Sequence, residues 1–424
     1  MQVHALDKPY RPVPIKIINA VGRMLERLNV EPVTLHKEAL LAKAVKRAGC
    51  GDFGDRGFHE GLDRLLASLE NEAELTLLGR LMAQGEIVGR LATRLRLIDW
   101  RKKHPELAEQ EIRQPLFIVG LPRTGTTILH ALLDVDPANR SPLFWEVEHP
   151  VPPPTPATWD NDPHIAEVER SLAQFNKICP GIQAVHVMEA RLQQECVAIL
   201  AMDMMAEQFY TMFNVPSYAH WLIDQPKDFS LQFHKQTLQH LQSGGVVGER
   251  WLLKSPCHLH LIRKLLEVYP DANVIHTHRD PIAVCTSISS MTAMLRGTAS
   301  DVVDLKLIGR QQVDLWSEML ARAVAQRRQL AKEGRGKQFF DLQMRETVAD
   351  PIGAVERIYD QFGYELKPAV KVKMEEFMKN NPRDKHGSHT YRPEDFGIEP
   401  TRDRARFAEY CEYFGVEKLS GASE

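Results

Sequence analysis

The stretch PLFIVGLPRTGTTILHALLD, residues 115–134, joins a short apolar run, a tight loop and a segment in which apolar residues recur at helical spacing. The run from Leu116 to Val119 is typical of a parallel strand that is buried on both faces. Gly120 and Gly125 allow backbone conformations and close approaches that a Cβ would prevent. The stretch therefore predicts a strand, an anion-binding loop and a helix whose first N–H groups face the anion.

The loop carries side chains suited to a phosphate group. Written G-x-x-x-x-G-T-T, it has the spacing of a nucleotide-binding P-loop, but Thr126 stands where a nucleoside triphosphatase has its lysine. The cation is Arg123, whose planar guanidinium can bind a phosphate through two hydrogen bonds. Thr124 and Thr127 add further hydroxyl donors. We expect the loop to hold a 5′-phosphate without Mg²⁺; the alternative is a strand-to-helix turn with no ligand.

A second stretch, residues 251–291, reads WLLKSPCHLHLIRKLLEVYPDANVIHTHRDPIAVCTSISSM. Together the two stretches resemble the sulfotransferase superfamily that uses 3′-phosphoadenosine 5′-phosphosulfate (PAPS), most closely its bacterial-type branch. In that family a P-R-S/T-G-T-T loop holds the 5′-phosphosulfate. A later R-D element, followed by a serine, holds the 3′-phosphate; Arg279 and Ser287 match it here. Lys254 matches a lysine that lies near the transferred sulfuryl group in tyrosylprotein-type members.

The resemblance covers roughly residues 110–400 and implies PAPS as donor, 3′-phosphoadenosine 5′-phosphate as product, and no metal. The implied donor-binding residues are Pro122, Arg123, Thr124, Gly125, Thr126, Thr127, Arg279, Ser287 and, in an irregular basic tail, Lys385, His386 and Gly387. For Arg279 the alternative is a salt bridge with Asp280, and for the tail it is a solvated basic loop. The sulfuryl group is expected to go to a hydroxyl or amine of a small-molecule acceptor, such as an alcohol, sterol, sugar or phenol.

Sulfuryl transfer passes through a loose in-line transition state, so the protein mainly positions the reactants and stabilises charge. Arg123 and Lys254 are expected to do this. A hydroxyl acceptor also needs a general base. The candidates for this base are Glu146, Glu148 and His258, while His186 and Glu195, on a helical insertion, are placed where they can touch the acceptor. Glu146 leads because its distance from Arg123 is similar to that in tyrosylprotein-type relatives; the local sequence WEVE differs from their G-E-E-T, which keeps Glu148 in contention.

The remaining pattern predicts an α/β fold with a three-layer, P-loop-like parallel sheet flanked by helices. We expect an all-α region at 1–110 and an α/β domain at 111–424, with a helical insertion at 162–243 and a cofactor-covering tail at 380–424. Further strands are expected within 141–150 and at 251–253, 273–277 and 338–342, and helices at 258–269 and 303–330. In the first helix, one stripe contains Ile17, Ile18, Val21, Met24, Leu25 and Leu28.

The amino-acid composition limits the kinds of partner that the protein is expected to bind. The 53 basic and 56 acidic residues give a net charge of −3, which argues against a general nucleic-acid binder. The six cysteines lack zinc-site or disulfide spacing, and the sequence has no apolar run long enough for a membrane span, so we expect a cytoplasmic protein without integral membrane association. Two alternatives to the transferase remain. A kinase would have a lysine in the phosphate-binding loop, residues 120–127, which we call the cradle. A catalytically silent nucleotide-binding scaffold would bind PAPS but form no sulfated product.

Overall fold

The computed structural model describes residues 6–381 and 391–418. Its centre is a five-stranded sheet in the order β2-β3-β1-β4-β5, and every neighbouring pair is parallel. The strands are β1 (Leu116–Gly120), β2 (Asn139–Arg140), β3 (Arg250–Lys254), β4 (Asn273–His278) and β5 (Phe339–Gln343). Because the strands are parallel, the loop after β1 and the ends of β3 and β4 lie at one edge of the sheet.

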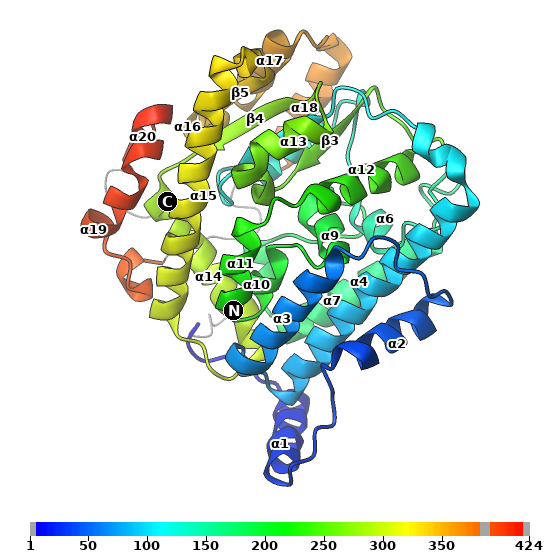
Figure 1. The fold of residues 1–424 in the computed structure, drawn as a ribbon. Coiled ribbons are helices and arrows are strands. Elements are labelled where there is room, and N and C mark those ends of the chain that lie inside the picture. The colour runs from blue at the N-terminus through cyan, green and yellow to red at the C-terminus, as the bar shows by residue number, and fades with distance from the viewer. Residues whose placement is uncertain (1–5, 382–390, 419–424) are drawn as a thin grey trace.

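Helices cover both faces of the sheet (Figure 1). Alternate residues of β1 enter two different hydrophobic cores: Leu116 and Ile118 one, Phe117 and Val119 the other. The first core contains residues of α5 (Thr126–Leu133), α17 (Pro351–Phe362) and α18 (Pro368–Asn380). The second contains residues of α12 (Asp228–Gln242), α13 (Ile262–Val268), α14 (Pro281–Ala299) and α15 (Leu305–Lys332). The predicted three-layer α/β fold is therefore confirmed.

The N-terminal region is helical, as expected. It comprises α1 (Val13–Arg27), α2 (Lys37–Ala48), α3 (Phe58–Glu72), α4 (Leu77–Lys103) and the 3₁₀ helix η1 (Pro105–Glu109). Side chains of α2, α3 and α4 belong to the same core as one face of the sheet, whereas α1 projects from the body at the bottom of Figure 1. Over the described residues, no helix combines the length and apolar character needed to cross a membrane.

The segment between β2 and β3 is mainly helical. It contains α6 (Phe144–Glu148), α7 (Pro163–Ile178), α8 (Ile182–Val185), α9 (Cys196–Leu200), η2 (Ala201–Asp203), α10 (Gln208–Met212), α11 (Pro216–Asp224) and α12. The expected strand within 141–150 is wrong, because β2 ends at Arg140 and α6 follows. A carboxylate oxygen of Glu146 accepts the Leu143 N–H at 2.8 Å and thereby stabilises the first turn of this helix.

The expected helix at 258–269 is also shorter than predicted. Residues Pro256–Leu261 form the 3₁₀ helix η3, and α13 begins only at Ile262. After β5 and α16 (Met344–Ala349), the described part of the tail forms η5 (Pro393–Phe396), α19 (Pro400–Arg404), η6 (Ala405–Phe407) and α20 (Ala408–Phe414). A further 3₁₀ helix, η4 (Arg335–Gln338), precedes β5. Arg404 of the tail pairs with Asp280 at 2.8 Å, so the tail reaches the end of β4.

Candidate active site

The loop between β1 and α5 is held tightly against the sheet. Gly120 has a φ of 140°, and a Cβ there would lie 2.4 Å from the Thr277 Oγ1 atom, so only glycine fits. Gly125, with a φ of 80°, directly precedes the first residue of α5. No side chain in the described part of the chain caps that helix, so its first N–H groups are available to an anion.

The three threonines of the loop have different environments. The Thr124 hydroxyl donates to the Leu121 carbonyl at 2.7 Å and lies 2.7 Å from the Thr277 hydroxyl. Thr124 and Thr126 are buried, whereas Thr127 is exposed. The Thr124 side chain therefore braces the loop against β4, which leaves the Thr127 side chain as the one most accessible to a bound group.

The structure brings Arg123, from the loop after β1, together with Arg279 and Ser287, from the segment that follows β4. Arg123 donates from Nε to the Ser287 hydroxyl at 3.2 Å and from Nη1 to the Val185 carbonyl at 2.6 Å. Arg279 donates to the Arg123 backbone carbonyl at 2.8 Å. Two guanidinium groups and a hydroxyl therefore converge beside the start of α5, an arrangement suited to a ligand with more than one anionic group.

Lys254 ends β3 and lies beside this cluster. Its ammonium group pairs with the Glu195 carboxylate, which immediately precedes α9, and its side chain is almost completely buried. His186 is a close neighbour of Lys254. Burial is the main cause that lowers the pKa of His186; the positive charges of Lys254 and Arg123 lower it further, while the negative charge of Glu195 raises it. The imidazole is therefore neutral at pH 7. Of the carboxylate and imidazole side chains singled out in the sequence, Glu195 and His186 are the two that the structure places next to Lys254.

Glu146 occupies a different position from the one expected of a base. Its side chain is fully buried, one carboxylate oxygen accepts from Arg140 at 2.5 Å, and the other accepts the Leu143 N–H. The Arg140 guanidinium is itself packed over the rings of Trp159 and Trp251. Glu146 thus belongs to an internal ion pair, and its carboxylate has no surface to offer an acceptor.

Glu148 also has a structural partner. It pairs with Arg90 of α4 at 2.7 Å and lines a cavity of about 340 Å³ between the N-terminal helices and α7. The other lining residues are Arg47, Thr93, Arg96, His149, Pro150, Val151, His164 and Glu167. None of these residues belongs to the loop between β1 and α5, so the cavity that Glu148 lines is separate from the phosphate-binding loop.

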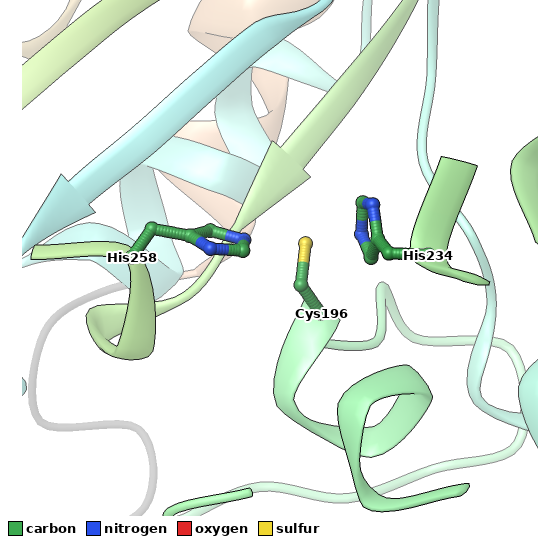
Figure 2. Close-up of side chains that lie close together, drawn as sticks. All are labelled: Cys196, His234 and His258. Atoms are coloured by element: carbon green, nitrogen blue, oxygen red, sulfur yellow. The ribbon is translucent and has the colours of Figure 1, made fainter. Parts of the chain in front are cut away.

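His258 lies inside the protein rather than at the mouth of the site. Figure 2 shows its ring on one side of the Cys196 thiol and the His234 ring on the other. All three side chains are fully buried, and burial lowers the pKa of both histidines. His258 also packs edge-on against Phe117 of β1. The structure therefore does not bring His258 to an acceptor. Lys385, His386 and Gly387 lie outside the described residues.

The loop between β1 and α5, the converging cations and the parallel sheet are typical of a protein that binds a phosphate-containing ligand at the carboxyl edge of the sheet. A sulfotransferase family model matches residues 115–368, which is more than half of the chain. The chain therefore belongs to the sulfotransferase family.

Solved structures and curated proteins agree with this assignment. The chain is similar to the sulfotransferase STF1 of Mycobacterium tuberculosis, with 32% identity, a TM-score of 0.77, and coverage of 88% of this chain and 98% of that one. It is also similar to STF9 of Mycobacterium avium, with 26% identity, a TM-score of 0.82, and coverage of 92% and 100%. A curated relative from Mycobacterium bovis, named omega-hydroxy-beta-dihydromenaquinone-9 sulfotransferase Stf3, is 28% identical over 263 residues. That match covers 59% of this chain and 62% of the relative.

Proposed function

We propose that this protein transfers a sulfuryl group from PAPS to the hydroxyl of a small acceptor. The observation that carries the proposal is the convergence of Arg123, Arg279 and Ser287 at the start of α5. The N–H groups of α5 and the Arg123 guanidinium suit the 5′-phosphosulfate. Arg279 and Ser287 suit the 3′-phosphate, which distinguishes PAPS from other adenylates. The site needs no metal for this chemistry, because the chain supplies its own fixed cations.

We assign the transfer chemistry to Lys254 and Glu195. The acceptor oxygen attacks sulfur while the bond from sulfur to the bridging oxygen of the phosphate breaks, and the electron pair remains on that oxygen. Lys254 stabilises the charge that develops on the leaving phosphate. Glu195 accepts the proton of the acceptor hydroxyl. His186 is the second candidate for the base, since it is neutral and lies beside the same lysine.

For the acceptor we propose a hydrophobic molecule with a terminal hydroxyl. The relative from Mycobacterium bovis is named for such a substrate, a hydroxylated dihydromenaquinone. In this chain, Arg123 contacts both α8, through the Val185 carbonyl, and α14, through Ser287. The same two helices carry four apolar residues, of which the first two are buried and the last two are partly exposed: Ile182, Val185, Met291 and Met294. A hydrophobic acceptor matches these side chains better than a sugar does.

Removal of the 3′-phosphate from the donor is expected to weaken binding by at least ~10-fold, because Arg279 then loses a charge-assisted hydrogen bond. Calorimetry with 3′-phosphoadenosine 5′-phosphate and with adenosine 5′-phosphate measures this difference without any acceptor. In the variant Arg279→Ala the difference in affinity between the two ligands is expected to shrink. In the control variant Arg345→Ala, which changes an exposed arginine, this difference is expected to remain. Equal affinities of the wild-type protein for both ligands would rule out PAPS as the preferred donor.

A further inference from the structure

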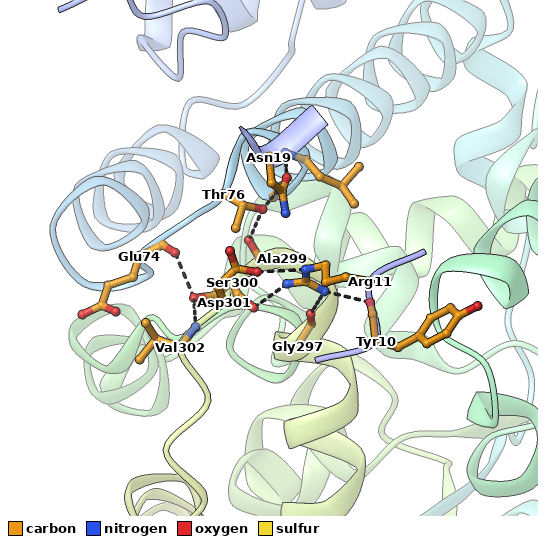
Figure 3. Close-up of polar contacts among 12 residues, drawn as sticks. Tyr10, Arg11, Asn19, Glu74, Thr76, Gly297, Ala299, Ser300, Asp301 and Val302 are labelled. Atoms are coloured by element: carbon orange, nitrogen blue, oxygen red, sulfur yellow. Dashed lines mark hydrogen bonds and ion pairs between the residues drawn. The ribbon is translucent and has the colours of Figure 1, made fainter. Parts of the chain in front are cut away.

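Helix α1 is attached to the body of the protein through Arg11, which lies two residues before the helix begins. Arg11 donates to the Gly297 carbonyl at 2.5 Å and to the Ser300 carbonyl at 2.7 Å, and its Nε lies 2.9 Å from an Asp301 carboxylate oxygen. Figure 3 shows these contacts at the end of α14. The Arg11 side chain is mostly buried. The segment that leads into α1 is therefore fixed by three partners in and directly after the last turn of α14.

One face of α1 packs against the start of α4. The side-chain oxygen Oδ1 of Asn19 accepts the Leu78 N–H at 3.3 Å. At Gly22 the two helices approach so closely that a Cβ would lie 2.6 Å from the Leu77 Cβ atom. Together with the Arg11 contacts, this packing fixes which face of α1 points away from the protein.

The outward face of α1 is apolar. Five large side chains spaced three or four residues apart are between 43% and 68% exposed: Val13, Ile17, Val21, Met24 and Leu28. Such spacing normally marks the side of a helix that is buried against a core. Scattered single exposed apolar residues are ordinary on protein surfaces, but a contiguous stripe along a projecting helix indicates a contact with something else.

The charges beside the stripe identify the kind of partner. At 100° per residue, Lys16, Arg23 and Arg27 lie within about 40° of one another along one edge of the stripe. Arg23 makes one exposed, 3.4 Å contact with Asp301. The other edge carries Pro14, Ile18 and Leu25 and no carboxylate. Two copies meeting stripe to stripe would therefore leave the basic edge without an acidic counterpart, whereas anionic lipid headgroups supply one.

We propose that α1 docks on a membrane surface that contains anionic lipids. The helix lies in the plane of the interface, with the stripe among the acyl chains and the basic edge at the headgroups. With 15 residues it is about 22 Å long, shorter than the ~30 Å hydrocarbon core, so it rests on the bilayer and does not cross it. This docking surface is independent of the donor and the acceptor.

Vesicle flotation tests the proposal with the full chain and no substrate. Wild-type protein is expected to bind vesicles of phosphatidylcholine mixed with phosphatidylglycerol at least ~10-fold more tightly than vesicles of phosphatidylcholine alone, and added salt is expected to reduce this difference. The double variant I17S/M24S removes apolar area from the stripe and is expected to weaken binding to both kinds of vesicle by ~10-fold or more. Its matched control, V247S/V372S, changes two exposed apolar residues elsewhere and is expected to bind like the wild type.

The basic edge has its own pair of variants. K16S/R27S is expected to reduce the preference for phosphatidylglycerol, while K373S/K379S on α18 is expected to retain it. The altered residues are exposed, and circular dichroism melting checks that each variant is folded. Absence of wild-type binding to the anionic vesicles would overturn the proposal, as would equal binding by I17S/M24S. A dimer by light scattering that I17S/M24S converts to a monomer, without vesicle binding, would assign the stripe to a second copy of the chain instead.

Discussion

Replacement of Lys254 by alanine is expected to lower kcat by ~10²- to 10³-fold and also to weaken donor binding. The Lys254 side chain is almost completely buried at the end of β3, and we propose that its ammonium group interacts with the bridging oxygen of the donor. Charge on that oxygen grows in the transition state, so the loss is larger in kcat than in donor affinity. The measurement is turnover of labelled PAPS together with donor affinity by calorimetry.

The matched control for this variant is Lys264→Ala. Lys264 is partly exposed on α13 and pairs with Asp228 and Glu267 at the surface, where such pairs contribute little. The activity of the Lys264→Ala variant is expected to equal that of the wild type. Folded Lys254→Ala protein with wild-type kcat would remove Lys254 from the chemistry.

Glu195→Gln is expected to lower turnover by ~10²-fold or more, with little change in donor affinity. The substitution keeps the size of the side chain and part of its hydrogen bonding to Lys254, but removes the basic carboxylate. The measurement is kcat with a verified acceptor, beside donor affinity. Glu146→Gln serves as a comparison: because Glu146 pairs with Arg140 inside the protein, that change is expected to lower the melting temperature.

His186→Asn decides between the two candidates for the base. If His186 accepts the proton, its substitution abolishes turnover and Glu195→Gln does not. In that case activity is expected to fall as the pH is lowered. Because burial favours the neutral imidazole, His186 becomes protonated, and activity is lost, only below its ordinary pKa of 6.5. A fully active Glu195→Gln variant would contradict our assignment.

The sequence was sufficient for the cradle because its signals are local. The apolar run of β1, the two glycines of the loop and the helical spacing after Thr126 lie within 20 consecutive residues, and each has a direct physical meaning. The role of Gly120 is an example. Its close approach to Thr277 in the structure explains why a residue without a Cβ stands at the end of the strand.

The partner of Lys254 was not predictable in the same way. Glu195 lies 59 positions earlier in the chain and outside any motif, and only the folded structure, in which it directly precedes α9, brings it to Lys254. Spacing from Arg123 pointed instead to Glu146, a carboxylate that stabilises α6 and a buried arginine. The apolar stripe of α1 is a similar case: its period predicted a helix, but only the position of Gly22 against α4 shows that the stripe faces outward.

The central claim is that this protein moves a sulfuryl group from PAPS to a hydrophobic hydroxyl compound. The most direct measurement incubates the purified full chain with PAPS labelled at sulfur, a chelator, and a prenylated quinol that carries a terminal hydroxyl. We predict label in the organic product and an equal amount of 3′-phosphoadenosine 5′-phosphate. Label that stays in PAPS with this acceptor and with alcohols, sterols, sugars and phenols, under conditions in which the donor is bound, would contradict the account.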